Sequence, residues 1–173
     1  MELLTLMKTR RTIRKFTEEK VSEDQLEVIL KAGLLAPSGR NLQPVEFFVT
    51  EDRAKILALE KCKDVGAGPL HEATLAIAIG GDREKTDIWI EDCSLAAMQM
   101  QLAVAALGLG SCWIHIRERK LGDRPADEVV REILDIPERF GIVCILAVGH
   151  KGEEKPAYGD EDPNFGRVHR EKK

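Results

Sequence analysis

The sequence is poor in aromatic residues and has no apolar run long enough to cross a membrane. Aromatic side chains make up 5% of its 173 residues, and the formal net charge is −4. Nucleic-acid binders usually need stacking aromatic side chains or a basic surface, so this composition argues against that class. The most apolar segment, residues 95–110, is shorter than the roughly 20 residues of a transmembrane helix and contains two glutamines. We therefore expect neither a nucleic-acid partner nor a membrane span.

Cysteine is scarce and lacks the spacing of a metal site. Cys62, Cys93, Cys112 and Cys144 are far apart, no C-x-x-C is present, and no Cys/His pair has zinc-like spacing. Three of the four stand in apolar runs, which is typical of reduced structural cysteines in a cytosolic protein. The N-terminal MELLTLMKTRR also lacks the order of charge and apolar residues found in signal peptides. We expect no metal and a cytoplasmic location.

The remaining pattern is that of one globular domain. Apolar residues make up 43% of the chain, enough for a sizeable core. Helical spacing is found in residues 3–8, from Ser22 to Pro37, in residues 51–60 and 91–107, and from Pro125 to Pro137. Strand patterns cover residues 45–50, 73–81, 111–116 and 141–150. This alternation predicts an α/β or α+β sheet domain covered by helices, followed by a polar tail over residues 151–173.

A basic segment, KTRRTIRKF, stands at residues 8–16. If it is extended, Arg10, Thr12 and Arg14 point to one side and their neighbours to the other. The two guanidinium groups then lie about 13 Å apart with a hydroxyl between them. Such a face suits a long ligand with a phosphate at one end and a carbonyl edge at the other, because arginine binds two oxygens at once. A solvated basic surface or a nucleic-acid patch is the alternative interpretation of the segment alone.

Two further segments are candidates for binding. PSGRNLQP supplies Ser38, Asn41 and Gln43 as compact polar groups, although an ordinary turn between a helix and a strand would look the same. LGLGSCWIHI contains a G-x-G at Gly108 and Gly110. A dinucleotide fingerprint needs a strand before the glycines and a third glycine after them, so a helix C-cap leading into a strand fits better.

The ordered set of motifs resembles the FMN-dependent nitroreductase family. The resemblance rests on RRTIRKF, LLAPSGRNLQPVEFFVT, AALGLGSCWI, ILAVGHKGEEKP and a basic C-terminus, which together span nearly the whole chain. It implies an α+β fold with a central, mostly antiparallel sheet flanked by helices, in an intertwined homodimer. It also implies a single domain over residues 1–173, whose tail from about residue 151 wraps the partner subunit, and FMN in two clefts between the subunits.

The family's chemistry is carried by the flavin rather than by a catalytic side chain. The resemblance implies that NADH or NADPH reduces the bound FMN, which then passes electrons to nitroaromatic, quinone or similar acceptors by a ping-pong route. The protein binds, orients and tunes the flavin. A same-fold flavin reductase or dehalogenase, and a non-enzymatic FMN-binding or flavin-storage protein, remain alternatives. The sequence does not distinguish NADH from NADPH.

By position, the resemblance assigns Arg10 to the FMN phosphate with Thr12 beside it, and Arg14 to the N1 and C2 carbonyl edge of the ring. Arg11 belongs to the same motif. Ser38, Asn41 and Gln43 would reach FMN in part from the partner subunit, and Trp113, Ile114 and His115 would pass beside the ring, with the N–H of His115 approaching N5. Arg167 is the candidate for a second phosphate ligand, with Arg170 as the fallback. Residues 60–70 are the place for a short version of the family's cleft-covering insertion.

Overall fold

A four-stranded antiparallel sheet forms the centre of the fold. The computed structural model describes residues 2–171, and within that range no helix is both long and apolar enough to cross a bilayer. The strand order is β1 (Val45–Thr50), β2 (Leu75–Asp82), β6 (Phe140–Gly149) and β3 (Gly110–His115). Every residue of β2 and β6 is buried, as their nearly continuous apolar sequences predict for central strands. The antiparallel sheet expected from the family resemblance is confirmed.

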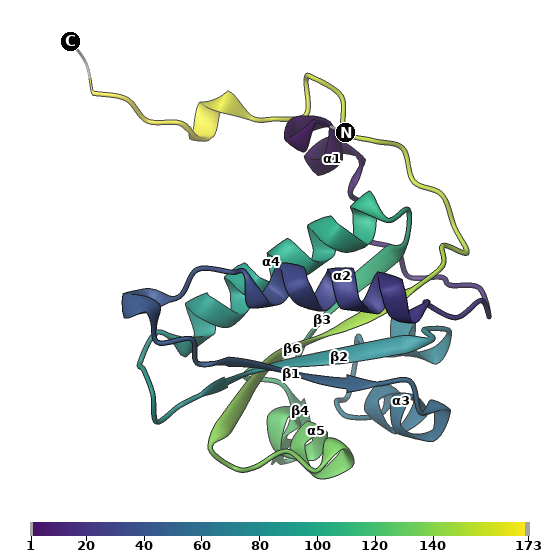
Figure 1. The fold of residues 1–173 in the computed structure, drawn as a ribbon, viewed down its shortest axis with the longest axis vertical. Helices are drawn as coiled ribbons and strands as arrows, with labels where there is room; N and C mark the ends of the chain where they lie inside the picture. The colour runs from purple at the N-terminus through teal and green to yellow at the C-terminus, as the bar shows by residue number, and fades with distance from the viewer. Residues whose placement is uncertain (1, 172–173) are drawn as a thin grey trace.

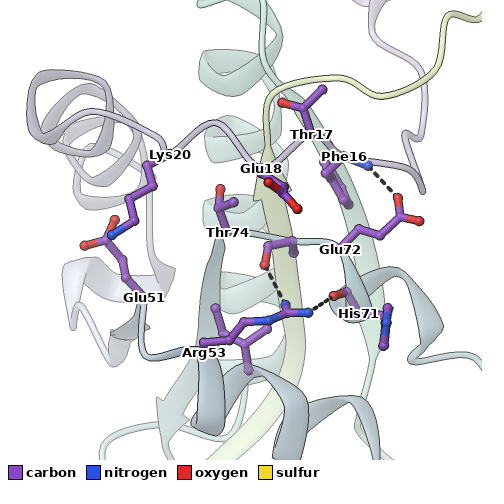
Figure 2. A pocket seen from close by; sticks show the side chains of 11 residues that line it. Phe16, Thr17, Glu18, Lys20, Glu51, Arg53, His71, Glu72 and Thr74 are labelled. Carbon is purple, nitrogen blue, oxygen red and sulfur yellow. Dashed lines mark hydrogen bonds between the residues drawn. The ribbon is translucent and has the colours of Figure 1, made fainter.

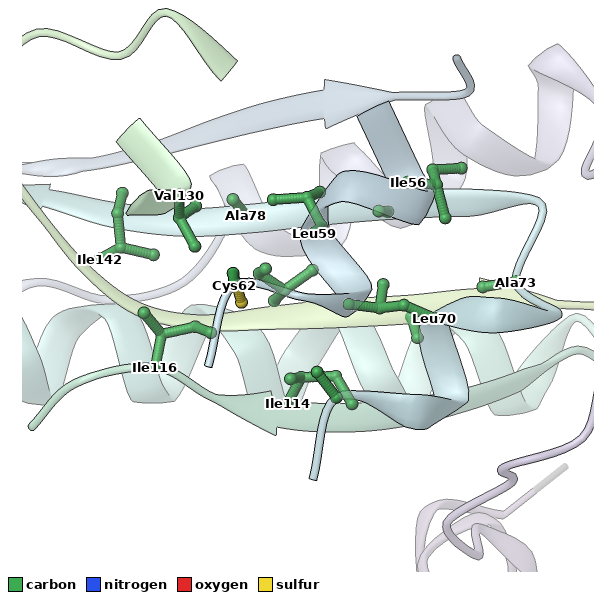
Figure 3. Close-up of a cluster of buried hydrophobic side chains, with 14 of the residues drawn as sticks. Ile56, Leu59, Cys62, Leu70, Ala73, Ala78, Ile114, Ile116, Val130 and Ile142 are labelled. Carbon is green, nitrogen blue, oxygen red and sulfur yellow. The ribbon is translucent and has the colours of Figure 1, made fainter. Parts of the chain in front are cut away.

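Helices cover both faces of the sheet (Figure 1). One face carries α2 (Glu23–Leu34) and α4 (Trp89–Ala106), and the other carries α3 (Arg53–Glu60) and α5 (Ala126–Leu134). Figure 3 shows the core under α3 and α5, where Leu59, Leu70 and Ile114 are almost wholly buried. The short 3-10 helix η2 (Gly68–His71) closes this side, and the two-residue strands β4 (Lys120–Leu121) and β5 (Arg124–Pro125) form a small hairpin beside α5.

The helix boundaries follow the capping signals in the sequence. Ser22 and Gln25 form the expected capping box of α2, with Ser22 accepting from the Gln25 N–H and Gln25 accepting from the Ser22 N–H. Gly108 follows α4 with φ at 78°, which is the expected C-cap. The last helix ends at Leu134, three residues before the predicted stop at Pro137, because Asp135 takes a left-handed conformation.

The basic N-terminal segment forms an extended strand at the outer edge of β3. It follows α1 (Leu3–Thr9), and Thr12 bridges Ser111 in parallel while the Ile13 N–H donates to the Ser111 carbonyl at 3.0 Å. Ile13 is buried directly over Gly110, where a Cβ atom would lie 2.8 Å from its Cγ2. Glycine at position 110 therefore lets the basic segment approach the sheet and fixes which residues turn outward.

The segment after β6 returns along the basic strand before the chain leaves the body of the protein. The Gly152 N–H donates to the Lys15 carbonyl at 2.8 Å, and the Tyr158 N–H donates to the Lys8 carbonyl at 3.0 Å. The tail expected from composition is thus packed against the basic strand as far as about residue 160. Beyond it the chain, including the 3-10 helix η3 (Phe165–Arg167), projects away from the rest of the protein (Figure 1).

Candidate active site

The two polar motifs singled out in the sequence lie at opposite ends of the sheet. Thr12 bridges Ser111, which pairs with Val148 near the end of β6. The loop of residues 38–43 leads into Pro44, whose carbonyl accepts from Asp82, and Asp82 pairs with Phe140 at the start of β6. Eight positions along β6 separate Phe140 from Val148, about 27 Å at the usual rise of a strand. One chain therefore does not place both motifs around one ligand.

Arg10 lies in a small cationic cavity near the start of β3. The cavity has a volume of about 40 Å³, and its lining includes Arg10, Ser111, Lys151 and Lys155. Glu154 is the carboxylate in the same lining. The sequence pattern did not predict that these two lysines belong to the site, although they stand in the HKGEEK segment directly after the last strand. Arg11 also lines this cavity, and a pocket with two arginines and two lysines is suited to a phosphate.

Arg14 is fixed through its backbone, and its side chain is exposed. Its N–H donates to Glu153 Oε1 at 2.6 Å, and Glu153 also forms an ion pair with Lys155 at 3.4 Å. The Arg14 N–H, followed by Lys155, lowers the pKa of Glu153. The carboxylate therefore remains ionised and holds the strand at this point while the guanidinium faces outward.

The outer edge of β3 presents backbone N–H groups beside this cationic strand. The Ile116 N–H donates to the Val143 carbonyl at 3.0 Å, and the Ser111 carbonyl accepts from Ile13. Antiparallel ladders alternate inward and outward groups, so the even positions of β3 bond to β6 while Trp113 and His115 direct their N–H and carbonyl groups outward. Ile114, also predicted to contact FMN, instead buries its side chain in the core and faces β6 with its backbone.

The Trp113 and His115 rings lie together on one side of β3. Their centroids are 6.4 Å apart with an interplanar angle of 15°, and Trp113 Nε1 lies 3.4 Å from His115 Nδ1. Burial lowers the pKa of His115, and the nearby cations Arg119 and Lys63 lower it further. The ring is therefore held in its neutral form, which can accept the hydrogen bond from Trp113.

The loop of residues 38–43 has a strained backbone that is held by hydrogen bonds. Arg40, Asn41 and Gln43 all have positive φ, between 47° and 55°, a conformation that costs non-glycine residues free energy. Ser38 Oγ accepts from the Gln43 N–H at 2.9 Å, and buried Asp92 of α4 accepts from the Gly39 N–H at 3.0 Å. These contacts hold the Asn41 and Gln43 side chains at the surface at this end of the sheet.

The other predicted arginines are placed differently within one chain. Arg11 donates to the Pro156 carbonyl and its guanidinium stacks 4.3 Å from the centroid of the Tyr158 ring, so it anchors the returning segment. Arg167 and Arg170 lie exposed in the projecting tail and are not among the residues that line the Arg10 cavity. Contact of either tail arginine with a phosphate at Arg10 would require a second copy of the chain.

A separate cleft of about 680 Å³ opens between residues 16–20, at the end of the basic strand, and the start of α3 (Figure 2). None of the residues predicted to bind FMN lines it. Its Arg53 donates to the His71 carbonyl at 2.5 Å, and its Glu72 accepts from the Phe16 N–H at 3.0 Å. These two charged groups therefore bind backbone groups of neighbouring segments, Arg53 that of η2 and Glu72 that of the basic strand. Within residues 2–171 no cluster of side chains has the geometry of a metal site.

The chain matches known proteins over almost its whole length. The model of the Nitroreductase family matches residues 7–67 and 57–150. An FMN-dependent nitroreductase from Clostridium difficile has a solved structure with a TM-score of 0.96 and 43% sequence identity, covering 98% of this chain and 99% of that one. An Archaeoglobus fulgidus protein, provisionally named an NADH dehydrogenase/NAD(P)H nitroreductase, is 35% identical over 99% of this chain and 98% of its own. The NADH dehydrogenase of Thermus thermophilus is 29% identical over 84% of each chain. From the motifs, the fold and these matches, the chain belongs to the nitroreductase family.

Proposed function

We propose that this protein is an FMN-dependent NAD(P)H oxidoreductase that passes electrons to nitroaromatic, quinone or similar organic acceptors by a ping-pong route. Its membership of the family and the names of its relatives, which include FMN and NAD(P)H, support this assignment. The flavin, when bound, supplies the redox chemistry. The chain contributes binding, orientation and electrostatic tuning.

The observation that carries this proposal is the combination of cations and outward N–H groups along one edge of β3. Arg10 can hold a phosphate together with Lys151 and Lys155. The exposed Arg14 follows four residues after Arg10 on the same strand. The outward N–H groups of Trp113 and His115 follow on the neighbouring strand. This order, from phosphate site to polar ring edge, fits FMN, and the residues present therefore fit the cofactor.

In this arrangement Arg10 and Thr12 would bind the phosphate, and Arg14 would hold the N1 and C2 carbonyl edge. A cation there stabilises the negative charge that the flavin gains on reduction. The outward N–H of His115 is the group suited to N5. Lys151 and Lys155 join the phosphate site from the same chain, and Arg167 or Arg170 would join it from a partner's tail.

The separation of the two motifs supports a homodimer as the working form. The two motifs lie beside opposite ends of β6, which are about 27 Å apart. We therefore infer that Ser38, Asn41 and Gln43 complete the cleft of the partner subunit. Apolar side chains that would be covered in a dimer are exposed on α1 and α4, among them Leu3, Leu4, Leu95 and Met98. We infer that the projecting tail wraps the partner, as the family resemblance implies.

The absorption spectrum of the purified protein, before and after NADH or NADPH is added without oxygen, tests the proposed function. We expect a flavin spectrum that bleaches with at least one nicotinamide and returns when a quinone is added. Protein that binds FMN but is reduced by neither nicotinamide would instead be a flavin-binding or storage protein. Protein that binds no FMN would contradict the proposal altogether.

A further inference from the structure

Lys63 is a buried lysine at the flavin-facing edge of β3. It follows α3, is only 9% exposed, and donates from Nζ to the His115 carbonyl at 2.7 Å. That carbonyl belongs to an odd position of β3, so it points outward beside the His115 N–H. The ammonium group therefore stands at the same edge as the N–H group that we assign to the flavin ring.

The surroundings of Lys63 leave its charge uncompensated. Within residues 2–171 no carboxylate lies within ion-pair distance of its ammonium group, and the titratable groups that act on it are Cys62, Cys112 and the cation Arg119. Burial lowers the pKa of Lys63, and Arg119 lowers it further. Burying a charge without a counter-charge costs free energy, so a lysine kept in such a place calls for an anionic partner that the polypeptide itself does not supply.

Other cations gather around the same point. Lys63, Arg14 and Lys155 all act on the thiol of Cys112, a buried residue of β3, so all three cations lie near this part of the strand. Glu153 is the carboxylate acting on the same thiol, and its Oε1 both accepts from the Arg14 N–H and pairs with Lys155. Lys155 is thus paired with a carboxylate, whereas the Lys63 ammonium group donates to a neutral acceptor, the carbonyl of His115.

We propose that Lys63 is a charge-compensating residue of the flavin site, whose ammonium group, held by the His115 carbonyl, favours negative charge on the bound flavin ring independently of Arg14. This rests on the proposed function, since it needs FMN at the edge of β3. Lys63 stabilises the reduced flavin relative to the oxidised flavin because only the reduced ring carries the additional negative charge.

The test uses the FMN-loaded protein and two readouts that require no turnover. One is the affinity for sulfite, an anion that adds to oxidised flavin and leaves negative charge on the ring. The other is the reduction potential of the bound flavin at fixed pH. Lys63→Met removes the charge and the hydrogen bond, Lys63→Gln removes the charge but can still donate, and Lys63→Arg keeps the charge. Lys61→Met, at an exposed lysine two residues away, is the matched control.

We expect Lys63→Met and Lys63→Gln to bind sulfite at least about tenfold more weakly than the parent. For the two-electron potential, the corresponding loss is about 30 mV. Lys63→Arg and Lys61→Met should stay near the parent. If Lys63→Gln behaves like the parent, Lys63 acts by positioning the strand and the inference is wrong, whatever Lys63→Met does.

The outcome also separates this inference from the proposed function. A parent protein that carries reducible FMN while all four variants match it overturns the role of Lys63 alone. A parent protein that binds no FMN overturns the proposed function, and the inference with it. Should Lys63→Met fail to fold, the comparison of Lys63→Gln with Lys63→Arg still decides the question, because both keep a polar donor and differ in charge.

Discussion

At the scale of single residues, the candidate site depends on arginines whose positions are set by contacts within the protein itself. Glu153 fixes the backbone of Arg14, so the guanidinium is presented without being consumed in an internal ion pair within residues 2–171. Arg11, the neighbour with the same chemistry, is used to anchor the returning chain against Tyr158. Two arginines that look equivalent in the sequence therefore have different structural roles, and the difference arises from which face of the strand each occupies.

Replacing Arg14 by alanine should leave FMN bound and make it harder to reduce. The cations proposed to hold the phosphate, Arg10, Lys151 and Lys155, do not depend on the Arg14 side chain, while the cation proposed to face the ring edge is lost. Anaerobic titration should show a lower flavin potential, by about 30 mV or more for a tenfold effect. Arg10→Ala is the contrasting variant, and it should purify with less FMN. An unchanged potential in Arg14→Ala, or an equally yellow Arg10→Ala, would contradict these roles.

His115 should make the folded protein less stable in acid. Burial and nearby cations lower its pKa from about 6.5, so between that value and the folded pKa the unfolded chain binds more protons. The free energy of unfolding is therefore unaffected by His115 above about pH 6.5, and it decreases as the pH falls below that value because the unfolded chain takes up the proton first. His115→Gln should therefore show a smaller loss of unfolding free energy between pH 7.5 and 5, measured with urea.

The matched control for His115 is His169→Gln, at an exposed position in the projecting tail. It should keep the pH dependence of the parent. Equal slopes of stability against pH in His115→Gln and the parent would mean that the surroundings of His115 do not disfavour its charged form.

At the scale of elements, most of the fold could be predicted from local signals. Three local signals each specify one structure, and all three are found: the capping box of α2, the apolar runs of β2 and β6, and the glycine after α4. The pairing of the basic strand with β3 could not be predicted, because no local pattern records which edge a distant segment will join. Lys151 and Lys155 were missed for the same reason, since they reach Arg10 only through the turn after β6.

Gly110→Ala tests whether the basic strand needs close approach to β3. A Cβ atom there would lie 2.8 Å from Cγ2 of Ile13, so the strand carrying Arg10, Thr12 and Arg14 must shift outward. We expect a loss of about 1–3 kcal/mol in unfolding free energy and a clear drop in FMN retention. Gly68→Ala, where nothing lies within 4 Å of the added atom, should change neither. FMN retention equal to the parent would show that the strand position is not critical for the cofactor.

At the scale of the whole molecule, the proposed FMN cleft is shared by two chains. The sequence placed both motifs in one cleft through the family resemblance, and it assigned part of the second motif to a partner subunit. The separation of the motifs supports that assignment, since the Arg10 strand joins β3 beside one end of β6 while the loop of residues 38–43 joins β2 beside the other end. A strained surface loop whose backbone is held by hydrogen bonds to Ser38 and Asp92 is suited to contact a second copy, because its polar groups are ordered in advance.

The most direct measurement is FMN retention in a heterodimer of two defective chains, made by co-expressing them with different tags and selecting for both. One chain carries Arg10→Ala, and the other carries Ser38→Ala with Asn41→Ala. Each homodimer alone should retain little FMN. If each cleft takes Arg10 from one chain and the loop from the other, the heterodimer contains one intact cleft and one doubly damaged cleft. We predict recovery of about one FMN per heterodimer, which NAD(P)H reduces at the parent's rate. A heterodimer that retains no more FMN than the two homodimers would contradict the shared cleft.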